Sequence, residues 1–183
     1  EFLQANARLD SVIEQVASSR TEIIRVSAYA SIAMHWLPGI IQRFREECPD
    51  VDVDIRMADH VDVPYELLAQ GKMDAILVSP QDEGQYEWVH LADDPMFAVL
   101  PKDFDTQGMT AFPLAAFEAR DFIMPSQGFD KDIMRIFNRI GVKPHILPTW
   151  VDDPTVISMV SHGLGVSMMT ELTVRGRTDG VKL

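Results

Sequence analysis

Two short segments have the residue types of a binding site for a small polar ligand. Tyr29, Ala30 and Ser31 join a β-prone run to a helical pattern, and residues 125–128 (Pro-Ser-Gln-Gly) join two such runs later in the chain. Free N–H groups at the start of a helix, together with a serine hydroxyl, can hold an anion or another polar group. Ligands of open parallel sheets bind beyond the carboxyl ends of the strands, so we expect the two segments to oppose each other across a cleft. Ser31 also suits a simpler role as the N-cap of its helix.

The other chemistry-bearing residues form no catalytic or metal-binding pattern. The histidines at positions 35, 60, 90, 145 and 162 show no i, i+4 pairing and have no cysteine partners, so the usual zinc spacings are absent. The sequence contains no G-x-S-x-G motif. The pairs Asp93-Asp94 and Asp152-Asp153 are adjacent in sequence, which is typical of turns and caps. We therefore expect no catalytic residues, no bound metal and no cofactor, and we expect that the chain is not an enzyme.

The glycines at 163 and 165 suggest a phosphate-binding loop at first sight. A dinucleotide fingerprint follows a strand and opens a helix, whereas here a helical run precedes the glycines and a strand-like run follows them. We predict that Gly163 ends the helix in a left-handed conformation. We predict that Gly165 lets the chain enter the sheet.

Charge and composition limit the possible partners. The net charge of the 183 residues is −12, and residues 50–94 carry twelve acidic side chains against two basic ones. Such a surface repels phosphate backbones, so we expect no direct contact with nucleic acid. The 46% of hydrophobic residues can form the core of one domain or two small lobes, and no apolar run of about 18 residues could span a membrane. The single cysteine is typical of a reducing compartment and predicts a cytoplasmic protein.

From residue 23 onward, strand-like and helical patterns alternate. Strand-like runs cover residues 23–27, 51–55, 73–78, 97–100, 122–124, 146–151, 166–169 and 181–183, while helices are expected after Ser31 and Asp62 as N-caps and over residues 130–140 and 154–162. This alternation favours parallel sheets with right-handed crossovers. The sequence therefore predicts an α/β fold with two lobes, divided near residues 92–101 and recrossed near 169–180. The ten methionines are expected mainly to fill gaps in the core.

Residues 1–20 show a narrow apolar seam with heptad spacing. Its members are Phe2, Ala5, Leu9, Val12 and Val16. This pattern predicts the end of a longer dimerising helix. An ordinary amphipathic helix packed on its own domain is the alternative, because the seam is only about two heptads long.

Several segments together resemble the effector-binding domain of LysR-type transcriptional regulators. They are residues 24–33 (IRVSAYASIA), 67–75 (LLAQGKMDA) and 162–166 (HGLGV). The resemblance implies a fold like that of type 2 periplasmic binding proteins, with two Rossmann-like lobes, a cleft between them and a preceding linker helix. It divides the chain into the end of the linker helix (1–20), regulatory lobe I (21–96 and 170–183) and regulatory lobe II (97–169).

The same resemblance implies the ligand and the partners. The cleft holds a small-molecule effector, and DNA is bound only through an N-terminal winged helix-turn-helix that precedes this sequence. The subunits form a homodimer, with a tetramer as a further state of the full-length protein, and no membrane is involved. The implied ligand-binding residues come from three loops: Tyr29, Ala30, Ser31, Asp59, His60, Val61, Pro125, Ser126, Gln127 and Gly128.

Two features depart from the family's pattern. Many members carry a small hydroxyl residue where this chain has Tyr29, which leaves the class of ligand open. The chain starts at Glu1 with neither an initiator Met nor a signal peptide, so we expect a fragment. It stops at Leu183, before the strand and helix that complete lobe I in the family, so we expect either that the sequence is cut short or that lobe I is completed differently. A solute-binding protein of a transporter, which shares the fold but predicts an exported monomer, is the main alternative. An enzyme on a similar fold is the third reading.

Overall fold

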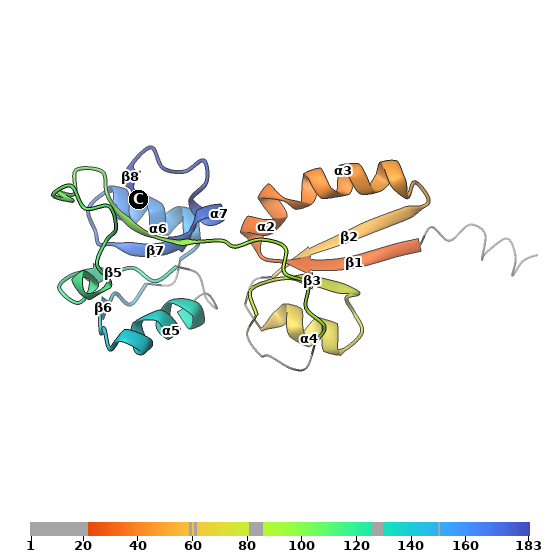
Figure 1. The fold of residues 1–183 in the computed structure, drawn as a ribbon, viewed down its shortest axis with the longest axis horizontal. Coiled ribbons are helices and arrows are strands. Elements are labelled where there is room, and N and C mark those ends of the chain that lie inside the picture. Colours follow the sequence, from red (N-terminus) through yellow and green to blue (C-terminus); the bar gives the residue numbers. More distant parts are fainter. Residues whose placement is uncertain (1–21, 59, 61, 81–85, 126–129, 150) are drawn as a thin grey trace, which may run out of the picture. The chain divides into compact units, whose positions relative to one another are not determined.

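The computed structural model describes two compact units (Figure 1). The described residues are 22–58, 60, 62–80, 86–125, 130–149 and 151–183, so the heptad seam of residues 1–20 lies outside them. Unit 1 holds residues up to 58 together with 64–77, and unit 2 holds residues 59–63 together with 78–183. No helix within the described ranges is both long and apolar enough to cross a membrane.

Unit 1 is built on a three-stranded parallel sheet, as the sequence predicts. The strand order is β2-β1-β3, and β1 pairs with β2 from Glu22↔Val51 to Ala28↔Met57. Figure 1 shows α3 and α4 on opposite faces of this sheet. The elements are β1 (Glu22–Ala28), α2 (Ala30–His35), α3 (Leu37–Glu47), β2 (Val51–Met57), α4 (Val63–Ala69) and β3 (Ala75–Leu77).

A bidentate ion pair joins β1 to the residue that leads into β3. The Arg25 side chain donates from Nε to Asp74 Oδ2 (3.0 Å) and from Nη2 to Oδ1 (2.7 Å), and the Arg25 main-chain N–H also donates to Oδ2 (2.8 Å). These hydrogen bonds lower the pKa of Asp74 from 3.8 to about 2. The pair fixes the start of β3 beside β1 with charge-assisted bonds.

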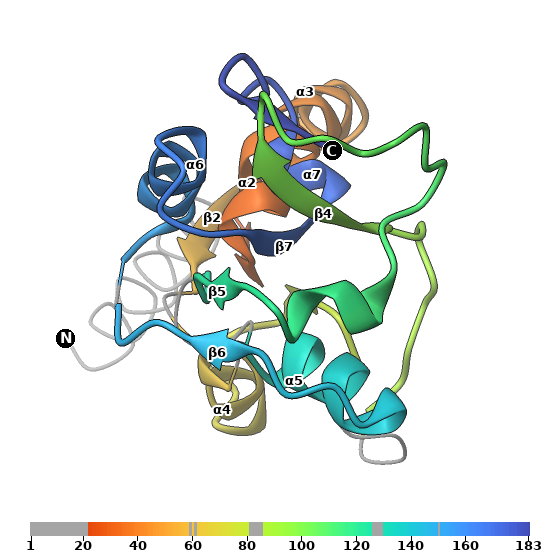
Figure 2. The same cartoon turned by 90° about the vertical axis from the view of Figure 1, so that its left-hand side faces the viewer.

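Unit 2 contains a mixed set of short strands between two helices (Figure 2). β4 pairs antiparallel with β7 and with β8, β5 pairs parallel with β6, and a parallel bridge joins Phe122 to Val166. Helices α5 and α6 lie on opposite sides of β5 and β7 in Figure 2. The elements are β4 (Met96–Pro101), η1 (Leu114–Phe117), β5 (Asp121–Phe122), α5 (Asp130–Ile140), β6 (His145–Ile146), α6 (Asp153–Ser161), β7 (Ser167–Thr170), α7 (Glu171–Val174) and β8 (Val181–Lys182).

Alternate side chains of β4 and β7 enter two separate cores of unit 2. Val99 and Met169 join the α6-side core, whereas Leu100 and Met168 join the α5-side core, because successive side chains of a strand point to opposite faces. The buried members of the α6-side core are Val99, Ile123, Val156, Ile157, Val160, Met169, Val174 and Val181. Those of the α5-side core are Leu100, Phe117, Phe122, Ile133, Phe137, Val142, Val166 and Met168.

Three features of the fold differ from the sequence-based expectation. The sequence predicts that residues 170–183 belong to lobe I, but α7 and β8 lie in unit 2, where β8 pairs with the end of β4. The second half is expected to repeat the parallel pattern, yet β4 runs antiparallel to both neighbours. β6 ends at Ile146, two residues before Pro148, which cannot donate to a strand ladder. In the first two cases pairing between distant residues, rather than local pattern, decides the outcome.

The two glycines after α6 have the structural roles that the sequence predicts. Gly163 has φ +75°, which is the left-handed conformation that ends many helices. A Cβ atom at Gly165 would lie 2.7 Å from the main-chain oxygen of Asp121. That oxygen accepts a hydrogen bond from the N–H of Val166 (2.9 Å), so strand pairing holds it in place.

Replacing Gly165 with Ala is expected to lower the free energy of unfolding by about 1–3 kcal/mol, because the new methyl group must displace main chain rather than a flexible side chain. Gly39→Ala in α3 is the control, since a Cβ there meets nothing within 4 Å. In a helix this control should raise stability by up to about 1 kcal/mol. Urea unfolding followed by circular dichroism measures both effects, and equal stabilities of the two variants would contradict the packing argument.

Acidic pH should weaken unit 1 through Asp74. A carboxyl with a lowered pKa in the folded state contributes stability above its unfolded pKa, and that contribution is lost as the pH falls through the folded-state value. Stability should therefore fall between about pH 4 and about pH 2, and Asp74→Asn should reduce that dependence. Melting temperatures across this range provide the measurement, with Asp52→Asn on β2 as the charge control. The expectation fails if Asp74→Asn and the parent chain show the same slope.

Candidate functional site

The first predicted ligand segment lies where β1 ends and α2 begins. Tyr29, not Ser31, is the N-cap of α2, so the prediction that Ser31 caps the helix is wrong. β1 extends through Ala28 by pairing with both neighbours, and the N–H of Tyr29 continues this pairing by donating to Leu77 (3.4 Å). Ala30 and Ser31 are consequently the first two residues of the helix, where N–H groups have no acceptor within the helix.

The second predicted segment follows β2. His60 Nδ1 accepts a hydrogen bond from the main-chain N–H of Asp62 (3.3 Å). The Asp62 carboxylate, which the sequence predicts as a helix cap, accepts from Lys131 Nζ at 2.6 and 2.7 Å. The loop carrying His60 is thus tied to the first turn of α5 within unit 2. The predicted residues Asp59 and Val61 lie outside the described residues.

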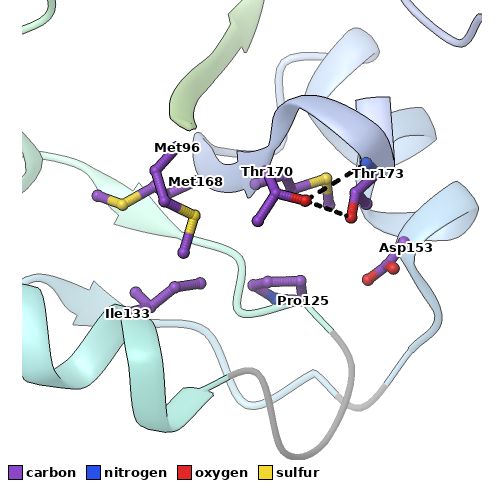
Figure 3. Close-up of a pocket in the computed structure, with 8 residues that line it drawn as sticks. Met96, Pro125, Ile133, Asp153, Met168, Thr170 and Thr173 are labelled. Carbon is purple, nitrogen blue, oxygen red and sulfur yellow. Dashed lines mark hydrogen bonds between the residues drawn. The ribbon is translucent and has the colours of Figure 1, made fainter. Parts of the chain in front are cut away.

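The third predicted segment begins at Pro125, which is buried and lines a pocket within unit 2. Ser126, Gln127 and Gly128 lie outside the described residues. The pocket is small and partly open to solvent, with a cavity volume of about 20 Å³. The lining residues come from β4, α5, α6, β7, α7 and the loop after β5, and Figure 3 draws them. They are Met96, Pro125, Ile133, Asp153, Met168, Met169, Thr170 and Thr173.

Pairing between β4 and β7 places the methionines of this pocket. Met96, the first residue of β4, lies opposite Thr170, the last residue of β7. Met168 and Met169 precede Thr170 and are 3% and 2% exposed. None of the three methionines is predicted from the sequence as a lining residue. The only signal in the sequence was the number of methionines in the chain. A methionine that fills a gap in the core gives the same local sequence pattern as a methionine that lines a pocket.

Helix α7 is fixed to the start of β4 beside the pocket. The N–H of Glu171 donates to the main-chain oxygen of Pro95 (2.9 Å), and the N–H of Leu172 donates to Asp94 Oδ1 (3.0 Å). Thr170 is the N-cap, and its hydroxyl accepts from the N–H of Thr173 (3.4 Å) while bonding to the Thr173 hydroxyl (3.0 Å). Asp94 and Thr170 therefore satisfy the first N–H groups of this short helix.

Helix α6 also starts at the pocket, and its first turn is already capped. The Asp152 carboxylate accepts from the N–H of Thr155 (3.0 Å), which confirms the expected capping role and lowers the pKa of Asp152. Asp153 follows as the first residue of the helix and is half-buried, and Pro154 has no N–H to offer. Among the described residues, no group of three or more His, Cys, Asp or Glu side chains could hold a metal ion.

The fold of the chain is that of solved regulatory and effector-binding domains. The structure matches the CcmR regulatory domain of Synechocystis PCC6803, solved in complex with 2-PG, with a TM-score of 0.75 and 17% identity over 88% of this chain and 79% of that chain. It matches the BenM effector binding domain with its effector benzoate with a TM-score of 0.75 and 18% identity over 90% and 77% of the two chains. These likenesses confirm the α/β effector-domain fold that the sequence predicts.

The sequence match then gives the family. The model of the LysR substrate binding domain matches residues 17–182, so the chain belongs to the LysR substrate-binding domain family. The uncharacterized HTH-type transcriptional regulator YvbU of Bacillus subtilis (strain 168) is 24% identical over 168 residues, 90% of this chain. XapR of Escherichia coli (strain K12), another HTH-type transcriptional regulator, is 22% identical over 173 residues, 92% of this chain. The chain spans 57% and 58% of these two relatives' lengths.

The Met168 side chain packs in the α5-side core and also lines the pocket. We therefore expect the stability of the fold to depend on the volume of this side chain rather than on its sulfur atom. Met168→Ala should lower the free energy of unfolding by about 2–5 kcal/mol through the cavity that it leaves. Met168→Leu keeps the volume and should cost less than about 1.5 kcal/mol. Chemical unfolding of the two variants decides the matter, and an equal cost for Ala and Leu would show that the side chain does not hold the pocket wall.

Proposed function

We propose that the chain is the effector-sensing part of a DNA-binding transcriptional regulator and not an enzyme. Membership of the LysR substrate-binding domain family supports this proposal, as do relatives named as HTH-type transcriptional regulators. The proposed ligand is a small molecule held by residues of both units. The proposed ligand-binding residues are Tyr29, Ala30, Ser31, Asp59, His60, Val61, Pro125, Ser126, Gln127 and Gly128.

The observation that carries the proposal is the presence of a pocket next to a predicted ligand segment. Pro125 belongs to that segment and also lines the pocket. The helix start after β1 adds N–H groups and the Ser31 hydroxyl in unit 1. Regulatory domains with this fold were solved with 2-PG and with benzoate, which supports a small-molecule ligand here.

The proposed output is a change in the geometry of the subunits or of their dimer when the effector binds. A ligand shifts such an equilibrium only by binding one state more tightly than the other. DNA contact through a preceding helix-turn-helix domain fits the acidic charge of this chain. The heptad seam in residues 1–20 supports a homodimer. The family resemblance suggests a tetramer as a further state of the full-length protein, and the single cysteine suggests the cytoplasm. A transporter's solute-binding protein would instead be an exported monomer.

Substitution of two serines tests the assignment of the ligand residues. The full-length regulator is first screened by thermal shift against a panel of small carboxylates, alcohols and amines. Ser31→Ala and Ser126→Ala should each weaken binding of the hit by about tenfold, since each removes one hydrogen bond of about 1 kcal/mol or slightly more. Calorimetric titration measures the affinity, and band shifts on DNA upstream of the gene show whether the hit changes DNA binding.

Ser158→Ala, at an exposed position on α6, is the matched control and should leave the affinity unchanged. Unchanged affinity in both Ser31→Ala and Ser126→Ala would place the ligand elsewhere. A full-length protein whose DNA affinity does not respond to the bound hit would refute the regulatory role.

A further inference from the structure

The outer strand of the unit 1 sheet has a sequence that is complementary to a second copy of itself. We propose that β2 (Val51–Met57) pairs antiparallel with β2 of another copy of this chain, about a two-fold axis at Ile55. The inference goes beyond the proposed function, because the contact uses neither the proposed ligand residues nor the heptad seam of residues 1–20.

One side of β2 directs main-chain groups away from the sheet. Within the described part of the chain the strand order is β2-β1-β3, so β1 pairs with only one side of β2. The N–H of Ala58 donates to the main-chain oxygen of Ala28 (3.0 Å), which shows that the even-numbered residues of this segment face β1. Because alternate residues direct their main-chain groups to opposite sides, those of Val53, Ile55 and Met57 point away from β1. Such a row of groups is a template for a further strand.

The side chains on one face of β2 are apolar and incompletely covered. Ile55 is 40% exposed and Met57 is 65% exposed, whereas Val26, the neighbour of Ile55 on β1, is only 8% exposed. Val53 lies on the same face, two residues before Ile55. In the proposed register Ile55 lies opposite Ile55 of the second copy, and Val53 lies opposite Met57. Each exposed side chain therefore gains an apolar partner across the strands.

The charges on the other face of β2 fix the register. Asp54 and Arg56 lie on either side of Ile55, and Arg56 Nη2 is 3.4 Å from Asp54 Oδ2 within one chain. A two-fold axis at Ile55 places Asp54 of each copy opposite Arg56 of the other, which forms two ion pairs between the copies. These positions share no main-chain hydrogen bonds, so their side chains lie closest together. An axis at Asp54 would instead set two carboxylates directly opposite each other, which is destabilising.

The charge of the whole chain opposes unspecific contact between copies. Each copy has a net charge of −12, and the twelve acidic side chains of residues 50–94 are accompanied by two basic ones, Arg56 and Lys72. Salt screens this repulsion beyond about 8 Å at physiological ionic strength, whereas side chains directly opposite each other are only about 5 Å apart. Contact is therefore favoured where a base meets an acid at short range, and Arg56 supplies that base at the edge of the sheet.

Disulfide trapping tests the contact, because a single strand pair is a small interface and trapping captures a weak association. Ile55→Cys is made in a Cys48→Ser background, so that the chain carries one thiol. Paired residues at this position have Cα atoms about 5.5 Å apart, a separation that a disulfide spans. In oxidised glutathione, Ile55→Cys should form linked dimers at least about tenfold faster than the control Ile23→Cys on β1, although Ile23 is 56% exposed. Equal rates would overturn the proposal.

Charge reversal in the Ile55→Cys chain tests the register. Arg56→Asp sets acids opposite acids and should slow trapping by about tenfold or more, whereas adding Asp54→Arg exchanges the charges and should restore at least about half of the original rate. Lys72→Asp makes the same change of charge at an exposed position before β3 and should slow trapping less than about twofold. An unchanged rate in Arg56→Asp, no rescue by the second change, or equal slowing by Lys72→Asp would overturn the proposal.

The outcome of the trapping test is separate from the outcome for effector sensing. If Ile55→Cys is trapped in the expected register but no ligand changes the DNA affinity of the full-length protein, the strand contact holds and the regulatory role is wrong. If a ligand changes DNA affinity but the two cysteine variants are trapped at equal rates, the regulatory role holds and the strand contact is wrong.

Discussion

The alternation of side chains along β4 and β7 is the constraint on which unit 2 depends. Val99 and Leu100 point to different cores, as do Met168 and Met169, so a slip of one residue would send each side chain to the wrong side. Both helices take their packing surfaces from this arrangement, α6 on one side and α5 on the other. The pocket lies where the pairing of the two strands ends, so strand register determines which side chains line it.

The order of the elements could be predicted from the sequence because hydrophobic periodicity is a local property. Helix α5 has the predicted bounds, Asp130–Ile140, and the parallel sheet of unit 1 follows the predicted rhythm. The errors arise where distant residues compete with a local preference. Asp62 directly precedes α4, as the sequence predicts, but the bond of its carboxylate to Lys131, 69 positions away, has no local signal. The two-residue strand β8 has too little local pattern to reveal that it pairs with β4.

The candidate site could be predicted only in part. Pro125 is identified by its place after a strand, and the structure shows it lining the pocket. The methionines and threonines of β7 could not be recognised as lining residues from the sequence. Met168, for example, belongs both to the α5-side core and to the pocket wall, and the sequence shows only that its side chain is apolar. Asp153 was expected to have the same turn or capping role as Asp152. The structure separates the two, with one carboxylate on the helix N–H groups and the other in the pocket wall.

The bonds from Pro95 and Asp94 to the start of α7 have a thermodynamic consequence for ligand binding. They hold the segment before Met96 against the turn that carries Thr170 and Thr173, so three lining residues come from backbone that is already ordered. Ordering loops and side chains on association opposes affinity, by about 0.5–1.5 kcal/mol for each flexible side chain that is fixed. A small ligand that binds against these residues therefore loses little of its binding free energy to ordering the backbone. The ordered backbone thus lowers the entropic cost of binding at this wall.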